Sequence, residues 1–166
     1  FQGMITHYNY YYNANRKINE MIERAKLAHK DDFNELLPFY NFSTKTTAGD
    51  SAELDSILYK ATAGIVLHDT RNSYVDNLYL LIGKSYFYWN KFDSAHRIFQ
   101  FINYNYFPKG KEEYIIVVGA NQNAEKGQLK IATKEKNSII HKAFSQPPSR
   151  NEALYWLAKT YAEDSL

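Results

Sequence analysis

Cysteine is absent from the 166 residues, so disulfides, a thiol nucleophile and any cysteine-based zinc site are excluded. A strong excess of charge is also missing. The net charge is +2, which is too balanced for a dedicated nucleic-acid binder, and no nucleic-acid partner is predicted. No long apolar run occurs either. These absences leave the cellular location open.

Tyrosine, in contrast, is abundant, with 15 copies in the chain. A tyrosine side chain combines a large apolar body with a polar tip, which suits helix faces that are half buried. Packing between helices is therefore the main interpretation of this composition. An aromatic surface that binds a peptide is the alternative.

A repeat signature lies at residues 76–108. It reads Tyr79-x2-Ile82-Gly83-x2-Tyr86, then Ala95-x3-Phe99, then Pro108. This pattern resembles the tetratricopeptide repeat, a helical hairpin of about 34 residues with the signature W-x2-L-G-x2-Y, A-x3-F and Pro. Tyr and Ile replace Trp and Leu and keep their bulk. The resemblance predicts two antiparallel helices at about Tyr74–Trp89 and Lys91–Tyr106.

Each position of the signature has a physical role in such a hairpin. Gly83 and Ala95 allow the two helix backbones to approach closely, and Tyr86 and Phe99 fill the space between them. Pro108 ends the second helix because proline lacks the backbone N–H and clashes with the preceding turn.

The residues before this hairpin predict further helices. An amphipathic stripe predicts a first helix at about Ile5–Ala28, with a break within Asn13–Arg16 as an alternative. A short helix is expected at about Asp31–Leu37, and a polar loop at Thr44–Asp50. Asp50 then caps a helix at about Ser51–His68, with Glu53 placed to complete a capping box. The apolar face of that helix comprises Leu54, Ile57, Leu58, Ala61 and Ile65.

After the hairpin, the repeat pattern is interrupted. Leu154-x2-Leu157-Ala158-x2-Tyr161 matches the first repeat helix again, and Asn151 is a plausible cap. Tyr161 follows Tyr86 by 75 residues, so an insertion of about 40 residues beyond one repeat is predicted. Residues 109–149 hold two β-branched runs, Tyr114–Val118 and Leu129–Thr133, which predict a β-hairpin followed by a helix. The lysines of this insertion favour a solvated edge, with an anionic partner as the alternative.

The predicted fold class is therefore all-α, a TPR-like α-solenoid of antiparallel helix pairs with a small β-hairpin insertion. Residues 1–3 resemble the remnant of a purification tag and are excluded from the fold. Residues 4–166 form one domain. It comprises divergent N-terminal helices at 4–75, the repeat at 76–108, the insertion at 109–149 and the first helix of a truncated further repeat at 150–166.

No pattern in the chain predicts catalysis. Lys126 precedes Gly127, the reverse of a phosphate-binding P-loop, and no serine lies in a nucleophile-elbow motif. The five histidines do not form a metal-binding pair, being scattered at His7, His29, His68, His96 and His141. The sequence predicts a protein that is not an enzyme, with no catalytic residue, no cofactor and no metal.

Four stretches carry a more specific resemblance. These are Tyr8–Asn15, His29–Pro38, Ala132–Asn137 and Pro147–Ala158. Together they resemble the N-terminal part of large tetratricopeptide-repeat lipoproteins of gliding Gram-negative bacteria (the SprE/PorW type), which are associated with gliding motility and type IX secretion. The resemblance implies a scaffold on the periplasmic face of the outer membrane. Its membrane association would depend only on a lipid anchor outside residues 1–166.

Stacked helix pairs form a concave face from the first helix of each pair, and this face is the predicted binding surface. Its aromatic and lysine side chains suit an extended peptide or a partner helix. The alternative functions are a structural solenoid that self-assembles and a generic peptide-binding TPR adaptor. The predicted partner-binding residues are Asn77, Leu80, Lys84, Phe87, Tyr88, Glu152, Tyr155 and Lys159.

Overall fold

A computed structural model describes residues 6–34, 42–67, 74–106 and 149–165. Within these ranges 82 % of the residues are helical and none lies in a strand, which confirms the all-α class for this part of the chain. The predicted tag remnant, Pro108 and residues 109–148 of the predicted insertion, including its hairpin, lie outside the described residues.

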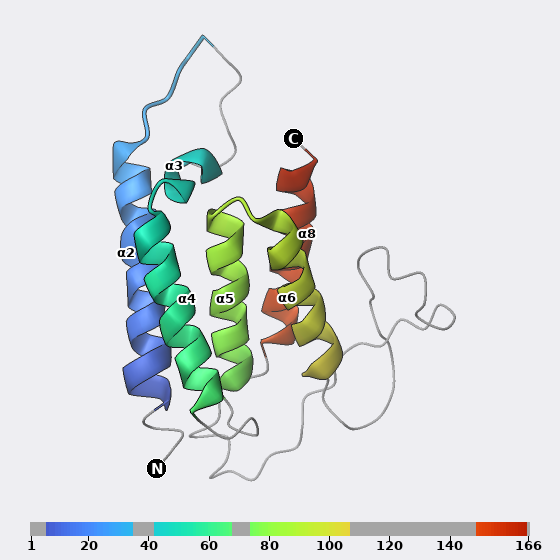
Figure 1. Cartoon of the computed structure of the whole chain (residues 1–166). Coiled ribbons are helices and arrows are strands. Elements are labelled where there is room, and N and C mark those ends of the chain that lie inside the picture. The colour runs from blue at the N-terminus through green and yellow to red at the C-terminus, as the bar shows by residue number, and fades with distance from the viewer. Residues whose placement is uncertain (1–5, 35–41, 68–73, 107–148, 166) are drawn as a thin grey trace, which may run out of the picture.

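In the described part of the chain, five long helices run side by side, and each packs on the long helix described before or after it. Figure 1 shows that α2, α5 and α8 point in one direction, whereas α4 and α6 point in the other. A π-helical segment, η1, continues into α2, and a short α3 precedes α4. The bounds are η1 Thr6–Tyr12, α2 Asn13–Ala28, α3 Thr44–Ala48, α4 Ser51–Val66, α5 Val75–Tyr88, α6 Phe92–Asn105 and α8 Arg150–Asp164.

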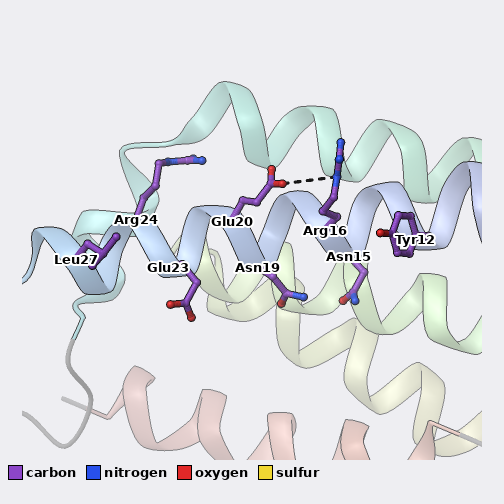
Figure 2. A pocket seen from close by; sticks show the side chains of 8 residues that line it. All are labelled: Tyr12, Asn15, Arg16, Asn19, Glu20, Glu23, Arg24 and Leu27. Atoms are coloured by element: carbon purple, nitrogen blue, oxygen red, sulfur yellow. Dashed lines mark ion pairs between the residues drawn. The ribbon is translucent and has the colours of Figure 1, made fainter.

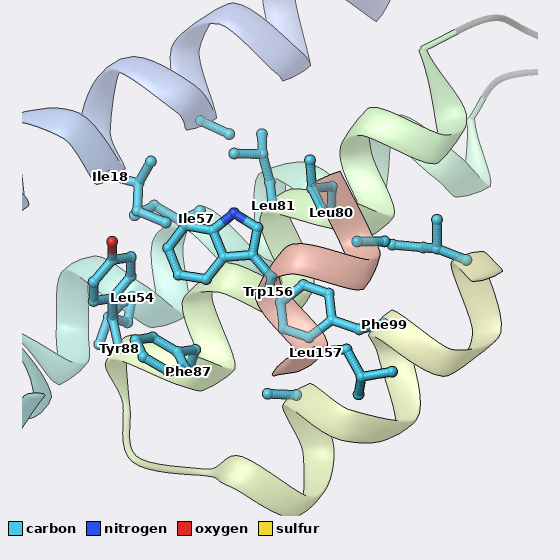
Figure 3. Close-up of a cluster of buried hydrophobic side chains, with 14 of the residues drawn as sticks. Ile18, Leu54, Ile57, Leu80, Leu81, Phe87, Tyr88, Phe99, Trp156 and Leu157 are labelled. Atoms are coloured by element: carbon cyan, nitrogen blue, oxygen red, sulfur yellow. The ribbon is translucent and has the colours of Figure 1, made fainter. Parts of the chain in front are cut away.

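The main apolar core joins all five long helices (Figure 3). Ile18 of α2 and Leu54 of α4 pack in the same cluster as Leu81 of α5 and Phe99 of α6. Trp156 of α8 lies among them, with its ring centroid 5.3 Å from that of Phe87. Because α8 contributes to this cluster, its position is fixed by the same burial that holds the preceding helices together.

The α5–α6 hairpin agrees only in part with the roles predicted for its signature residues, because Gly83 makes room for the ring of Phe99 and not for a neighbouring helix backbone. A Cβ atom placed on Gly83 would lie only 2.4 Å from the ring of Phe99, so the absence of a side chain allows this close packing. Ala95 and Phe99 are fully buried. The turn is a Schellman motif, in which the N–H of Lys91 donates to the carbonyl of Tyr86 at 2.9 Å and the N–H of Asn90 donates to that of Phe87 at 3.0 Å.

Two N-terminal features differ from the sequence expectations. The first helix does continue through Asn13–Arg16, where a break was the alternative, with a change from π-helix to α-helix at Asn13. Thr44–Asp50, predicted as a loop, contains α3, because the Ser43 hydroxyl caps it by accepting from the N–H of Lys45 at 3.1 Å. Residues 31–34 are not helical. The Asp32 carboxylate accepts instead from the backbone and side chain of Asn34.

The predicted capping box of α4 is wrong, although the helix does begin after Asp50. The Asp50 side chain makes no capping hydrogen bond. Arg24 at the end of α2 instead pairs with Glu53 and lies 3.6 Å from the Asp50 carboxylate. Arg24 of α2 therefore interacts with the two carboxylates, Asp50 and Glu53, that the sequence pattern predicted as a capping box. Leu54, Ile57 and Ala61 of the predicted apolar face are fully buried.

Candidate functional site

The eight predicted partner-binding residues do not form one exposed face. Asn77, Leu80, Phe87 and Tyr88 are buried, with at most 7 % of each exposed. Their expected exposure is wrong. Trp156 of α8 packs against Phe87 and Tyr88, the ring of Phe42 packs against Tyr88, and the Ser149 hydroxyl donates to Oδ1 of Asn77. Glu152 and Tyr155 are exposed on α8, whereas Lys84 and Lys159 are partly buried.

A groove of about 450 Å³ lies where α2, α5 and α8 come together, the three helices that point in the same direction. Two of the predicted partner-binding residues, Tyr88 and Lys159, line this groove. The other lining residues are Asn19, Ile22, Glu23 and Lys26 of α2, Phe42 before α3 and Trp156 of α8.

Aromatic rings pack on one another along this groove. The ring centroids of Phe42 and Tyr88 are 6.0 Å apart, and those of Tyr88 and Trp156 are 5.7 Å apart in an edge-to-face arrangement. Ile22 of α2 extends the apolar surface. Tyr88 and Trp156 are only 3 % and 8 % exposed, so these two rings pack mainly on their neighbours, whereas Phe42 and Lys159 are partly exposed at the groove.

Lys159 places an ammonium group against this aromatic surface. Its Nζ lies 4.7 Å from the ring centroid of Trp156, 5.2 Å from that of Phe87 and 5.8 Å from that of Phe42. Burial lowers the pKa of Lys159. Glu163 on the same helix acts in the opposite direction, and Lys84 adds to the lowering. The charge is thus partly withdrawn from water within the groove.

Ion pairs hold the other lysines nearby. Lys26 Nζ lies 2.7 Å from Glu23 Oε1 on α2, and both residues line the groove. Lys84 Nζ lies 2.5 Å from Glu152 Oε1, so this pair joins α5 to α8. Lys84 also lies 5.2 Å from the ring centroid of Trp156. Each of these two pairs places a lysine against a carboxylate beside the groove.

A buried polar junction positions α8 against α5. The Asp76 carboxylate accepts hydrogen bonds at 2.8 Å from the backbone N–H groups of Ser149 and Asn77. The Ser149 hydroxyl donates to Asn77 Oδ1 at 2.9 Å, and Arg150 Nε donates to Asn103 Oδ1 of α6 at 2.9 Å. Asp76 therefore provides the hydrogen-bond acceptor for the backbone N–H of Ser149 at the N-terminus of α8. The sequence predicted Asn151 as the cap of this helix. Asn151 instead lies inside the helix and is exposed.

A larger cavity of about 620 Å³ follows the outer face of α2 (Figure 2). All the described residues that line it belong to η1 or α2, so groups from different helices do not converge there. Arg16 and Glu20 form an exposed i,i+4 ion pair at 3.6 Å, a contact of small energetic value. Figure 2 also shows Asn19 and Glu23 pointing to the side of α2 on which α8 lies, the side of the groove.

Metal-binding geometry is not found in the described part of the chain, where no three His, Cys, Asp or Glu side chains gather. The ring of His96 packs on that of Tyr161, with centroids 4.0 Å apart, and its buried Nε2 has no hydrogen-bond partner. Of the helices that the structure describes, none has the length and apolarity needed to span a bilayer.

Sequence reasoning missed most of the groove. The α2 contribution was detectable in principle, because Asn19, Ile22, Glu23 and Lys26 recur at the three- and four-residue spacing of one helix face. Phe42 had no such signal, since it reaches the groove from an irregular segment next to α3. Trp156 aligns with Leu81 of the first repeat, and this match predicts only that Trp156 is buried.

The chain matches no protein-family model, no curated protein and no solved structure.

Proposed function

We propose that this chain is a non-enzymatic scaffold that binds a protein partner in the groove between α2, α5 and α8. The observation that carries the proposal is the composition of that groove. Three parallel helices from distant parts of the chain supply one surface on which aromatic rings, a half-buried ammonium and polar edges converge. A surface of this kind suits peptide recognition better than reaction chemistry.

An internal equivalence supports the finer proposal that the helices are units of a TPR-like solenoid. Ser85 Oγ donates to the carbonyl of Leu81 at 2.8 Å, and Thr160 Oγ1 donates to that of Trp156 at 2.7 Å, so the same buried contact recurs 75 residues later. The Gly83 position of α5 then corresponds to Ala158 of α8. In such an arrangement α2, α5 and α8 are the first helices of successive pairs and line the concave side.

Blocking the groove tests the proposal. Asn19 is exposed at the edge of the groove, so Asn19→Trp places a bulky ring there without disturbing the core. The matched control is Tyr59→Trp, because Tyr59 is 76 % exposed on α4 and does not line the groove. We expect crosslinked capture of a specific partner from native cells to be lost with Asn19→Trp and kept with Tyr59→Trp. Equal capture by both would contradict the proposal.

For the cellular setting, we propose an outer-membrane, periplasm-facing role linked to secretion or gliding motility. The support is the sequence resemblance of the four stretches given above. The test is the same capture from native envelopes with the full-length protein tagged at its own locus. Recovery of secretion or motility components in the membrane fraction is the expected result, and recovery of cytosolic proteins alone would overturn this setting.

Self-assembly is the second candidate, and an exposed aromatic on α8 favours it. Tyr155 is 56 % exposed, and its neighbour one turn on, Ala158, is exposed at the position equivalent to Gly83. Light scattering of the purified chain distinguishes the candidates. A concentration-dependent dimer that Tyr155→Glu abolishes supports self-assembly, whereas a monomer throughout supports the binding scaffold.

A further inference from the structure

We infer that the α2 wall of the groove binds an extended segment of the partner through its main chain, with the side-chain amides of Asn15 and Asn19 paired to alternate residues. This inference rests on the proposed scaffold function and specifies the chemistry of its ligand. The occupant is a polypeptide backbone in a strand conformation, and its recognition depends little on its sequence.

The two asparagines belong to one row of side chains on α2. Asn15, Asn19 and Glu23 follow one another at four-residue spacing. Figure 2 shows all three pointing to the side of α2 on which α8 lies. Asn19 and Glu23 line the groove itself, and Asn15 continues the row by one turn toward the N-terminus. Because Glu23 is already ion-paired with Lys26 at 2.7 Å, the row presents two amides to a ligand.

The fold does not use these two amides. Asn19 is exposed and Asn15 is partly exposed, and within the described residues neither side chain has a hydrogen-bond partner. Other asparagines are engaged. Asn13 Nδ2 donates to the carbonyl of Asn9 at 3.0 Å, and Oδ1 of the buried Asn103 accepts from Arg150 Nε at 2.9 Å. The donors and acceptors of Asn15 and Asn19 therefore face solvent and any segment that enters the groove.

The chemistry and spacing of these amides match an extended main chain. An asparagine side chain accepts through its oxygen and donates through its NH2 group, so it complements a residue that offers both N–H and C=O. In a strand, each residue directs these two groups to one edge and the next residue directs them to the opposite edge. Two strand residues advance by about 6.6 Å, and four helix residues advance by about 6 Å. Asn15 and Asn19 therefore each meet one of two alternate residues on a single edge.

The same reasoning excludes a helical ligand for this row. A helix satisfies its backbone groups internally and offers none along its sides. Partly exposed apolar groups are also present at the groove, those of Ile22 and Phe42, on which one side chain of an extended segment packs. Since the side chains of a strand alternate between two faces, this contact requires an apolar residue at only one or two positions.

The test uses the peptide GSTFTVTSG and two N-methylated forms of it. One form is methylated at its phenylalanine and valine, which removes N–H groups from one strand edge, and the other at its threonines, which removes them from the opposite edge. Binding is measured by NMR titration of the full chain labelled with nitrogen-15, in which the asparagine NH2 signals are observed directly. We expect the unmodified peptide to shift the signals of Asn15 and Asn19. One methylated form should match it in affinity, and the other should bind about tenfold more weakly.

Variants assign the effect to the two amides. Asn15→Ala and Asn19→Ala are each expected to weaken binding of the unmodified peptide by about fivefold, and the double variant to make the two methylated forms equivalent. Asn151→Ala is the matched control, because Asn151 is an exposed asparagine of α8 that does not line the groove, and it should leave the affinities unchanged. Alanine favours a helix more than asparagine does, so these variants should remain folded, which circular dichroism checks.

The outcomes separate this inference from the function on which it rests. Equal binding of the two methylated forms, whether both are weakened or neither is, overturns the main-chain contact. An unmodified peptide that leaves the Asn15 and Asn19 signals unshifted overturns it as well. In either case the groove remains a binding site if native capture is still sensitive to Asn19→Trp. If capture is also insensitive to Asn19→Trp, the proposed function is overturned too.

Discussion

At the scale of residues, two glycines set the distances between helices. Gly83 contacts the ring of Phe99 so closely that an added Cβ would lie 2.4 Å from it. Gly64 of α4 is also confined, although less tightly, since a Cβ there would lie 2.9 Å from both Leu78 and Tyr10. Gly83 was predictable from its place in the repeat signature. Gly64 was not, because its partners come from two segments with no pattern linking them.

Gly83→Ala should lower the free energy of unfolding by about 1–3 kcal/mol, the usual cost of overfilling a packed interior. The measurement is urea denaturation followed by circular dichroism. Gly49→Ala is the matched control, because Gly49 is exposed with φ −65° and a Cβ there would meet only the carbonyl oxygen of Thr46, at 3.3 Å. It should change the free energy of unfolding by less than about 1 kcal/mol. Equal losses at both positions would contradict the close contact.

Asn90 adopts a left-handed conformation, with φ 58°, in the turn between α5 and α6. Asparagine tolerates this region better than other residues with a side chain, and glycine tolerates it best. We therefore expect Asn90→Ala to lower the melting temperature and Asn90→Gly to raise it or leave it unchanged, with about 1 kcal/mol between the two variants. Calorimetry provides the comparison, and a more stable alanine variant would contradict the assignment.

At the scale of elements, α8 is attached to the hairpin by polar contacts that the sequence did not reveal. Its helical character was predictable from its match to α5. Its N-terminal partner was not, because Asp76 lies 73 residues before Ser149 and only the fold brings them together. The short helix α3 was also not predicted, because it too depends on a contact between residues that are far apart in the sequence. Thr47 is fully buried and its hydroxyl lies 2.9 Å from the carbonyl of Tyr88, a tertiary contact that stabilises a helix too short to predict.

Asp76 gives this junction a dependence on pH. Burial raises its pKa, while the hydrogen bonds from Ser149 and Asn77 oppose the rise. A carboxyl with a raised pKa holds its proton more tightly in the folded protein than in the unfolded chain. Its contribution to stability is therefore greatest below the ordinary pKa of aspartate and falls as pH increases through the interval up to the raised pKa.

We expect Asp76→Asn to flatten the decrease in unfolding free energy across that interval, and Asp76→Ala to cost about 1–3 kcal/mol at every pH by leaving the buried N–H of Ser149 without an acceptor. Urea denaturation at a series of pH values measures both effects. An unchanged pH profile in Asp76→Asn would show that other groups dominate the dependence.

At the scale of the whole molecule, the order of the helices was largely predictable and the groove was not. Amphipathic stripes and the repeat signature located α2, α4, α5, α6 and α8, because each depends on local spacing. The groove depends on which faces those helices turn toward one another. Phe87 and Tyr88 were expected on the surface, yet Trp156 of α8 covers them.

Trp156→Ala tests how far the molecule depends on this one side chain. Removing a large buried aromatic typically costs about 3–5 kcal/mol, from lost burial and the cavity that remains. We expect a loss of this size in urea denaturation, together with faster amide hydrogen exchange in α8 than in α4 and α5. Uniform acceleration across all helices would indicate that α8 unfolds only with the rest.

The lengths of the connections imply an order of events in time. Three residues separate α5 from α6, whereas the chain between α6 and α8 runs from Tyr106 to Ser149. Short loops close first, because closing a long loop costs more conformational entropy, which only the final contacts offset. The hairpin should therefore form early on the folding pathway and α8 should dock last. By the same reasoning α8 should detach first under strain, removing the indole and the ammonium from the groove while the other helices remain associated.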